Sequence, residues 1–258
     1  MTNLPTNLRK LINSGSLALG SWITIGDNKV TEILSISGFD WLAIDLEHST
    51  INIEKAGDLI RIISMNQITP LVRLTNLDEN LIKRVMDAGA GGIIVPNIST
   101  SEEVQKAIKA TRYPPNGNRG VGLDRAQGYG TKFKEYLDWQ KEGPIVVVQI
   151  ENISAIKNLK DIFNVDGLDG FLIGPYDLSC SMGIPGEFSN PKFIDTVNLI
   201  LDIGKKSGIA VGTHIVEPDL NLLKQSIDNG YSFIAYSVDI RMLSEAAIQA
   251  RKLINHKS

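Results

Sequence analysis

The chain has 258 residues, a formal net charge of −3, 43 % hydrophobic residues and 21 % charged residues, a composition typical of globular proteins. Its lysines and arginines are scattered rather than gathered in a basic stripe, so we expect no nucleic-acid partner. A single cysteine, Cys180, excludes an intramolecular disulfide and a four-thiolate zinc site. No apolar run is long enough for a membrane span and no secretory signal is apparent, so we expect a cytoplasmic protein without membrane partners.

Short β-rich runs alternate with longer amphipathic stretches along the chain. The runs cover residues 17–25, 40–47, 69–75, 91–97, 144–151 and 169–179, followed by the segments IAVGTHI and YSFIAYSVD. Each run precedes a stretch with helical periodicity. We expect Thr75 or Asn76 to cap the third helix and a residue within 99–101 to cap the fourth, while Gly89 and Gly230 end helices.

Eight β-then-α units are the number that closes a (β/α)₈ barrel. The runs are nearly continuous in Ile, Val and Leu, as expected of strands covered on both faces. A doubly wound open sheet is the alternative, but the chain lacks the nucleotide-binding glycine loop typical of that fold. The sequence therefore predicts one TIM-barrel domain over residues 1–258. The sequence does not show at which end of the barrel the irregular stretch of residues 113–130 lies. Within it, Arg119 and Arg125 are candidates to contact an acidic group.

Polar side chains stand at the ends of four of the predicted strands. Because parallel barrel strands end on one face, and that face carries the chemistry of such barrels, these residues predict an active site. They are Asp45, Glu47 and His48 after the second strand, Arg73 on the third, Gln149 and Glu151 on the fifth, and Asp177 on the sixth.

Glu151 and Asp177 end neighbouring predicted strands. Two carboxylates placed so close repel each other unless a cation lies between them, and a divalent metal ion is one solution. The alternative is that one of them pairs with a lysine or arginine at the rim. A site with two oxygen ligands and open positions suits Mg²⁺, Mn²⁺ or Co²⁺.

His48 and Arg73 are the candidates for proton transfer and for binding an oxygen-rich substrate. A histidine near a strand end is often only packed or solvated, but a carboxylate bonded to its ring would make it a general base, and Asp45 and Asp87 could supply that carboxylate. The guanidinium of Arg73 needs an anionic or carbonyl partner, either the substrate or simply Glu47.

The remaining candidates narrow the chemistry. No lysine lies in a predicted strand, so a Schiff base is not expected, and a carbonyl substrate would need a metal ion for activation. His214, at the end of the seventh strand, is expected to face the barrel mouth, where it touches substrate or only lines the pocket. We expect Cys180 to be a packing residue and His256 to be solvated.

Several motifs, in order and over nearly the whole chain, resemble the HpcH/HpaI class II aldolases. They are DLEHS (45–49), PLVRL (70–74), MDAGAGGIIVPN (86–97), RGVGLDRAQGYG (119–130), QIEN (149–152) and IGPYDLSCSMGIPG (173–186). The resemblance implies a TIM-barrel, metal-dependent pyruvate aldolase that forms and cleaves 4-hydroxy-2-oxoacids. It also implies a homohexamer in which the C-terminal helix, about residues 240–254, is exchanged between subunits.

The resemblance assigns roles to matching residues. It implies that Glu151 and Asp177 bind the metal, that His48 is the general base, and that Asp45 and Asp87 orient it. Arg73 would bind the pyruvate oxygens, with Gln149 behind the metal ligands. Backbone amides around Tyr176 and Asp177 would receive the pyruvate carboxylate, with Gly174 leaving room for close approach.

Tyr176 and His214 depart from the family pattern and lie where the aldehyde would be selected, so the aldehyde is not predicted. An acyl-CoA lyase of the citrate lyase β-chain type remains an alternative, as does a barrel that binds a ligand without catalysis. A phosphoenolpyruvate mutase is disfavoured because its characteristic cysteine loop is missing.

Overall fold

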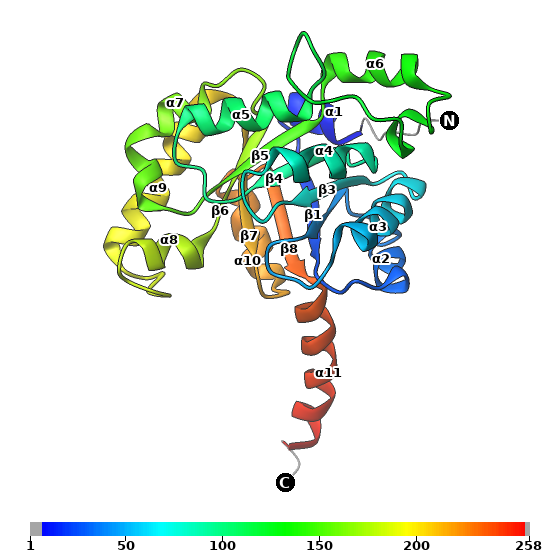
Figure 1. Cartoon of the computed structure of the whole chain (residues 1–258). Coiled ribbons are helices and arrows are strands. Elements are labelled where there is room, and N and C mark those ends of the chain that lie inside the picture. Colours follow the sequence, from blue (N-terminus) through cyan, green and yellow to red (C-terminus); the bar gives the residue numbers. More distant parts are fainter. Residues whose placement is uncertain (1–6, 256–258) are drawn as a thin grey trace.

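The computed structural model describes residues 7–255, and its eight strands form a closed barrel in chain order (Figure 1). Every neighbouring pair is parallel, including β1 with β8. The predicted (β/α)₈ barrel is therefore confirmed. The strands are β1 (Ala18–Ile23), β2 (Trp41–Asp45), β3 (Thr69–Arg73), β4 (Gly92–Val95), β5 (Ile145–Ile150), β6 (Gly170–Ile173), β7 (Ala210–Ile215) and β8 (Phe233–Val238).

One main helix follows each strand. These helices are α2 (Asn28–Ser35), α3 (Ile53–Met65), α4 (Glu79–Asp87), α5 (Ser101–Thr111), α7 (Leu159–Phe163), α9 (Pro191–Ser207), α10 (Leu220–Asp228) and α11 (Asp239–Asn255). Thr100 caps α5, within the range predicted. The predicted cap of α4 is wrong: the helix begins at Glu79, so the residue directly before it, Asp78, is the cap and accepts the hydrogen bond from the Asn80 backbone N–H.

Five further elements interrupt the β-then-α pattern, and apart from η2, which forms the first part of the helical stretch predicted after the fifth strand, the sequence analysis did not predict them. They are α1 (Asn7–Asn13), η1 (Arg125–Gln127), α6 (Phe133–Glu142), η2 (Ile153–Asn158) and α8 (Pro175–Ser181). One of these elements, α8, changes the site, because the sixth predicted strand, residues 169–179, was too long. β6 ends at Ile173, and Asp177 lies in the first turn of α8 instead of on a strand.

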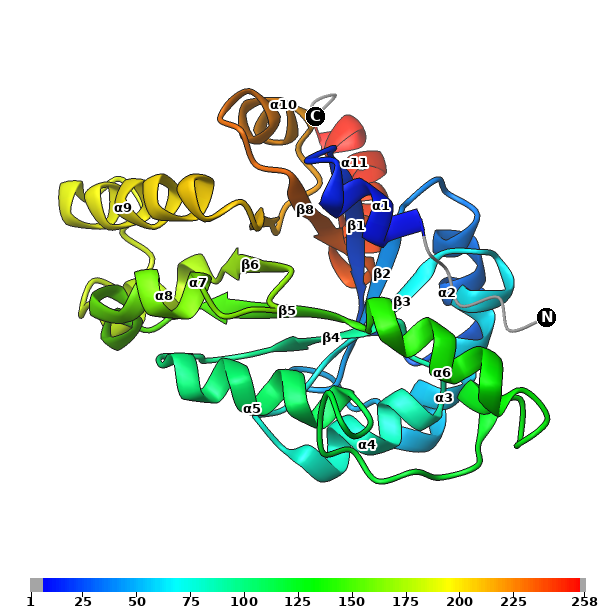
Figure 2. The same cartoon turned by 90° about the horizontal axis from the view of Figure 1, so that it is seen from above.

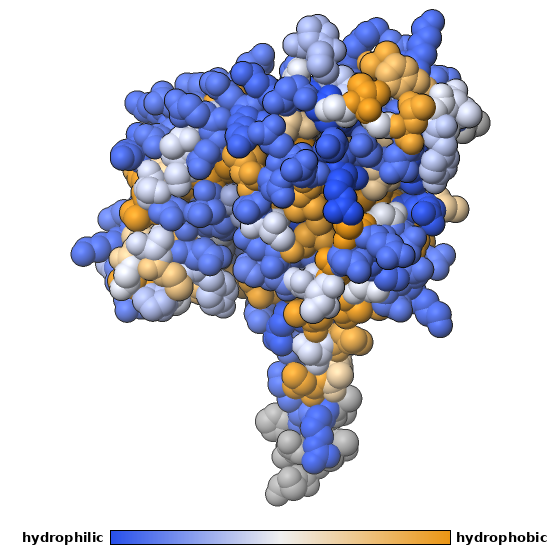
Figure 3. All heavy atoms as spheres, in the orientation of Figure 1, coloured by the Kyte–Doolittle hydropathy of each residue, from blue (hydrophilic) through white to orange (hydrophobic). Residues whose placement is uncertain are grey.

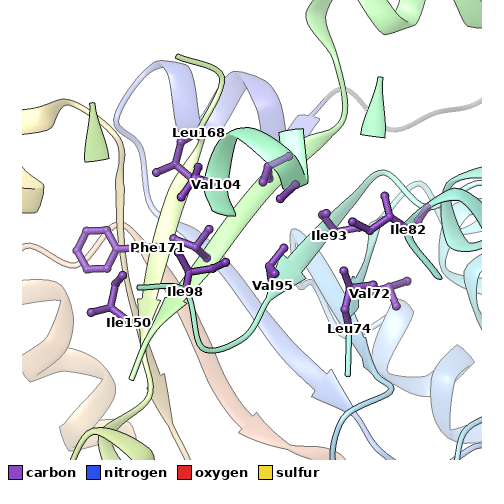
Figure 4. Packing of buried hydrophobic residues seen from close by; sticks show 14 of the residues in the cluster. Val72, Leu74, Ile82, Ile93, Val95, Ile98, Val104, Ile150, Leu168 and Phe171 are labelled. Carbon is purple, nitrogen blue, oxygen red and sulfur yellow. The ribbon is translucent and has the colours of Figure 1, made fainter. Parts of the chain in front are cut away.

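Two apolar layers hold the barrel together. The larger lies between the strands and the surrounding helices, where residues such as Val72, Ile93, Ile150 and Phe171 interdigitate (Figure 4). The smaller fills the barrel interior with Leu8, Ala18, Trp22, Trp41, Ala43, Leu71, Ile94, Ile145, Val147, Leu172, Ala210, Phe233, Ala235 and Val238. Side chains alternate between the two layers along each strand. The interior is thus packed, and open chemistry is confined to its ends.

The segment between α5 and β5 is organised around a buried arginine. Arg119 is 3 % exposed, lies 4.3 Å from the ring centre of Tyr113, and donates a hydrogen bond to the Tyr136 hydroxyl at 2.7 Å. Its predicted acidic partner is Asp87, 3.8 Å away. Arg125 instead donates to the Ala88 carbonyl. The helices α6 and α1 both lie at the end of the barrel where the strands begin (Figures 1 and 2).

The last helix, α11, leaves the barrel where β8 ends and projects away from it (Figure 1). Apolar side chains lie along this projection, including the exposed Ile240, Leu243 and Ile248 (Figure 3). None of the helices in the described part of the chain is long and apolar enough to cross a membrane. His256, predicted to be solvated, lies outside the described residues.

Candidate active site

Inward-facing polar residues gather at the end of the barrel where the strands finish. Parallel register places Asp45 beside Arg73 on neighbouring strands, and Gln149 beside Leu172. His214 occupies the inward face of β7, as predicted, two residues beyond Gly212. Trp22, at the inward end of β1, was not singled out from the sequence, although alternation along LALGSWITI marks it as inward-facing. Arg73 lies with its guanidinium carbon 4.4 Å from the Trp22 ring centre.

Asp45 holds Arg73 through a two-point hydrogen bond. Arg73 Nε donates to Asp45 Oδ1 at 2.9 Å and Nη2 donates to Oδ2 at 2.6 Å, while Nη1 lies 3.4 Å from Glu47 Oε2. Burial by itself would raise the pKa of Asp45, but the Arg73 contacts and two backbone amides outweigh it and lower the pKa. Asp45 is therefore ionised, and Nη1 is the guanidinium nitrogen with the loosest protein contact.

The carboxylate beside the His48 ring is Glu47, which corrects the expectation that Asp45 would bond to it. His48 Nε2 lies 3.7 Å from Glu47 Oε2, whereas Asp45 Oδ1 accepts the backbone N–H of His48 at 3.2 Å. Asp45 thus fixes the loop after β2 rather than the imidazole. The side chain of His48 is 65 % exposed, so it can meet a ligand entering the mouth.

Asp87 lies apart from this group. It sits at the end of α4, where its nearest cation is Arg119, and burial raises its pKa against the opposing effect of that arginine. Within the described part of this single chain, no hydrogen bond or ion pair joins Asp87 to His48. The expected orienting role therefore cannot be filled by the Asp87 of the same chain.

Glu151 lies buried at the end of β5, 7 % exposed, and is held on two sides. Its Oε1 accepts the Asn97 amide at 2.7 Å and its Oε2 accepts the Gln149 side-chain amide at 2.8 Å. A Cβ added at Gly174 would lie 2.5 Å from Glu151 Oε2, so only glycine fits at that position. Burial, above all, raises the pKa of Glu151 to about 7, and the negative charges of Glu47 and Asp177 add to the effect.

Asp177 joins this carboxylate cluster from α8. It lies near enough for its charge to contribute to the raised pKa of both Glu47 and Glu151, although these three carboxylates do not converge on one point. Tyr176 beside it is 55 % exposed and packs edge-on against Phe188. No side chain caps the first turn of α8. The structure thus brings Glu151, Asp177, Arg73 and Asp45 together at the mouth, with Glu47 and His48 on its rim.

The raised pKa values give a test that uses the protein alone. In the presence of a chelator, we expect the stability of the folded protein to fall by a few kcal/mol between pH 5 and pH 8, because folded Glu47 and Glu151 bind protons up to about pH 7 whereas unfolded carboxyls release them near pH 4.5. Urea unfolding of wild-type protein and Glu151→Gln at both pH values measures this. The variant should lose part of the slope; identical slopes would contradict the assigned burial of that carboxylate.

Comparison with known proteins decides the family. The profile of the HpcH/HpaI aldolase/citrate lyase family matches residues 19–246. This chain belongs to that family. It is 36 % identical over 241 residues to the hydroxypyruvate/pyruvate aldolase of Roseobacter denitrificans, covering 91 % of each chain, and 34 % identical to the 4-hydroxy-2-oxovalerate aldolase of Rhodococcus jostii, covering 95 % of each.

A solved HpcH/HpaI family protein from Burkholderia cenocepacia superimposes with a TM-score of 0.91 at 29 % identity, over 97 % of this chain and 99 % of that one. The resemblance noted in the sequence is confirmed. As a member of the HpcH/HpaI family with aldolase relatives, the chain is a carbon–carbon lyase, as predicted.

Proposed function

We propose that the chain is a divalent-metal-dependent aldolase that reversibly cleaves a 4-hydroxy-2-oxoacid into pyruvate and an aldehyde. The observation that carries this proposal is the convergence at one barrel mouth of two metal-type carboxylates, an arginine held by an aspartate, and an exposed histidine. None of the eight strands contains a lysine, which disfavours Schiff-base chemistry. The aldolase relatives support the same reaction class.

The residues present fit a divalent ion. Glu151 and Asp177 supply hard oxygen ligands, the buried Glu151 carboxylate has no cation paired with it among the described residues, and Gly174 leaves the space beside its Oε2 open. In the described part of the chain no three His, Cys, Asp or Glu side chains converge on one point. Two carboxylates would leave the other positions of Mg²⁺, Mn²⁺ or Co²⁺ to water and substrate.

When bound, such an ion polarises the 2-oxo group and stabilises the enolate that develops in cleavage. Arg73 donates from Nη1 to a substrate oxygen, because Asp45 already holds Nε and Nη2. Gln149 keeps the Glu151 carboxylate in place, and the uncapped amides of Tyr176 and Asp177 face the substrate carboxylate. These contacts orient the 2-oxoacid with C4 toward the rim.

His48 takes the proton of the 4-hydroxyl during cleavage. The C3–C4 bond breaks as C4 becomes the carbonyl carbon of the aldehyde. The electron pair of that bond forms the C2–C3 double bond of the enolate, and protonation of the enolate at C3 yields pyruvate. Glu47 lies closest to the imidazole and stabilises its protonated form. Asp87 can take the orienting role assigned by the family resemblance only if it comes from another copy of the chain.

Cleavage of 4-hydroxy-2-oxopentanoate, followed through the pyruvate released, tests the function directly. We expect turnover with Mg²⁺, Mn²⁺ or Co²⁺ and none with excess chelator. An acyl-CoA lyase of the citrate lyase β-chain type would release no pyruvate from this compound and would act on an acyl-CoA instead. A barrel that only binds ligands would give neither product.

We further propose that the active protein is a homo-oligomer, a hexamer by family resemblance, in which α11 packs on a neighbouring copy. Exposed apolar side chains on α11 and on the barrel surface, which would be the two sides of such a contact, support this. Leu243 on α11 is 65 % exposed, and α10 has no buried residue. Ile33 on α2 and Ile36 directly after it are 60 % and 71 % exposed. Large exposed apolar patches of this kind mark interfaces.

Leu243→Glu is therefore expected to lower the mass of the particle in solution, because it places a charge in the proposed interface. Light scattering coupled to gel filtration measures the mass. Arg251→Glu, an exposed change on the same helix, should leave the mass unchanged. A monomeric wild-type protein would rule out the exchanged helix.

A further inference from the structure

Two complementary polar atoms lie buried side by side in the barrel mouth. The indole Nε1–H of Trp22 and the imidazole Nε2 of His214 have no hydrogen-bond partner among the described residues. Their rings are 5.6 Å apart between centres, and both come from inward-facing positions at the ends of β1 and β7. Buried polar groups in proteins are paired with few exceptions, since each unpaired one costs about 1–3 kcal/mol.

The backbone of β8 favours Nε2 of His214 as the nitrogen that accepts. The pairing of β1 with β8 shifts by one residue between Gly20 and Trp22, and within this bulge Ser237 adopts a positive φ of 54°. Bulges and left-handed non-glycine residues of this kind re-aim groups near functional sites. Here the Ser237 carbonyl accepts a hydrogen bond from the Ser21 hydroxyl, and it lies close enough to the His214 ring to oppose the lowering of the pKa of that imidazole.

Since Nε2 has no partner among the described residues, the ring nitrogen that the Ser237 carbonyl can favour in its protonated form is Nδ1. A neutral imidazole carries one N–H, so Nε2 presents a lone pair to the mouth. Burial, followed by the charge of Arg73, lowers the pKa of His214 to about 4, which keeps the ring neutral at physiological pH. The mouth therefore offers a fixed acceptor on His214 next to a fixed donor on Trp22.

This donor–acceptor pair lies at the same barrel mouth as the proposed metal carboxylates, beside Arg73. The Trp22 ring contacts both the Arg73 guanidinium and the His214 ring, whereas Glu151 follows β5 and Asp177 lies on α8. In the proposed pose C4 lies toward the rim, and we place the carbon that follows C4 beside Trp22 and His214, because Trp22 lies against the Arg73 guanidinium that holds the 2-oxoacid. A hydroxyl group on those carbons can donate to one ring and accept from the other.

We propose that His214, together with Trp22, selects aldehydes that carry a hydroxyl group next to the carbonyl. The proposal rests on the aldolase function proposed above and adds the class of its second substrate. A hydroxyaldehyde satisfies both buried atoms, whereas an aldehyde with a methyl group in the same place leaves both unpaired. Sites built to bind a substrate hydroxyl reject the analogue that lacks it for this reason.

The test compares glycolaldehyde with acetaldehyde, which differ only by the hydroxyl, as acceptors for pyruvate. We expect kcat/KM of the wild-type enzyme to favour glycolaldehyde by about 10–100-fold, the range for one or two hydrogen bonds to buried groups. His214→Leu should reduce that ratio at least about tenfold, and Trp22→Phe should reduce it in the same direction. His214→Gln, which keeps an acceptor, should retain part of the preference.

Each other outcome has one meaning. No preference in the wild type, or a preference that survives His214→Leu, overturns the proposal and leaves the two atoms to an internal water. A preference for hydroxypyruvate over pyruvate that His214→Leu removes overturns the assignment to the aldehyde. Exchange of the pyruvate methyl protons in D₂O is measured on the wild type in parallel. Its absence would defeat the aldolase function itself, whereas exchange without hydroxyl preference defeats only the selection by His214.

Discussion

Glu151→Gln is expected to abolish tight binding of the divalent ion and to lower aldolase turnover by at least about 10²-fold, because polarisation by a metal ion supplies several kcal/mol of transition-state stabilisation. The substitution removes the charge and keeps the shape of the side chain, and its oxygen can still accept the backbone N–H of Asn97. Its NH2 group then donates to Gln149 Oε1, which has no partner among the described residues of the wild type, once the Gln149 amide turns over. Titration calorimetry with Mn²⁺ and steady-state turnover at saturating metal measure the two effects.

Two further variants sharpen the result. Gly174→Ala should weaken the same ion without altering any ligand, since its Cβ would lie 2.5 Å from Glu151 Oε2 and displace the carboxylate. Glu32→Gln, an exposed change on α2, serves as the matched control and should behave as wild type. Glu151→Gln should fold normally, because it removes a buried charge that disfavours folding above pH 7. Unaltered metal affinity in Glu151→Gln would exclude the proposed metal site.

His48→Ala is expected to lower kcat by about 10²–10⁴-fold, the usual contribution of a positioned general base. Metal affinity should stay within a few-fold of wild type, because His48 touches Glu47 and not the proposed ligands. Steady-state cleavage of a 4-hydroxy-2-oxoacid and Mn²⁺ titration separate the two quantities.

The exposure of His48 allows a second readout. With 65 % of its side chain open to solvent, free imidazole should reach the space left by His48→Ala and restore part of the turnover in a concentration-dependent way. Glu47→Gln should change the pH profile of kcat more than Asp45→Asn does, since Glu47 is the carboxylate beside the imidazole ring and Asp45 contacts only the backbone of His48. Turnover that is unchanged in His48→Ala would remove the residue from the mechanism.

The barrel was predictable because its signal is local. Continuous apolar runs in β2, β5 and β6 are typical of strands covered on both faces, and their regular alternation with amphipathic stretches allows few architectures. The unpredicted α1 and α6 have weaker signals. Leu8 of α1 is buried in the barrel interior and Tyr136 of α6 is buried around Arg119, so both helices depend on partners distant in sequence.

The sequence predicted which residues lie together at the barrel mouth, but it did not predict which contacts they make there. Strand ends placed Asp45, Arg73 and Glu151 at one mouth, because parallel strands end together. Which carboxylate contacts which cationic group depends on loop geometry, which the sequence does not show. Asp45 contacts Arg73, Glu47 lies beside His48, and Asp177 lies in α8 rather than on a strand. Asp87 is a different case: it ends a helix that runs antiparallel to the strands, so the barrel topology places it at the opposite end from the mouth of its own chain.

Proton exchange at the methyl group of pyruvate tests the central claim most directly, since it requires no knowledge of the aldehyde. Metal-loaded protein is incubated with pyruvate in D₂O and the methyl signal is followed by NMR, with chelator-treated protein and Glu151→Gln as controls. The proposed enolate chemistry predicts loss of the signal only in the metal-loaded wild-type sample. Persistence of the full signal with Mg²⁺, Mn²⁺ and Co²⁺ alike would contradict it.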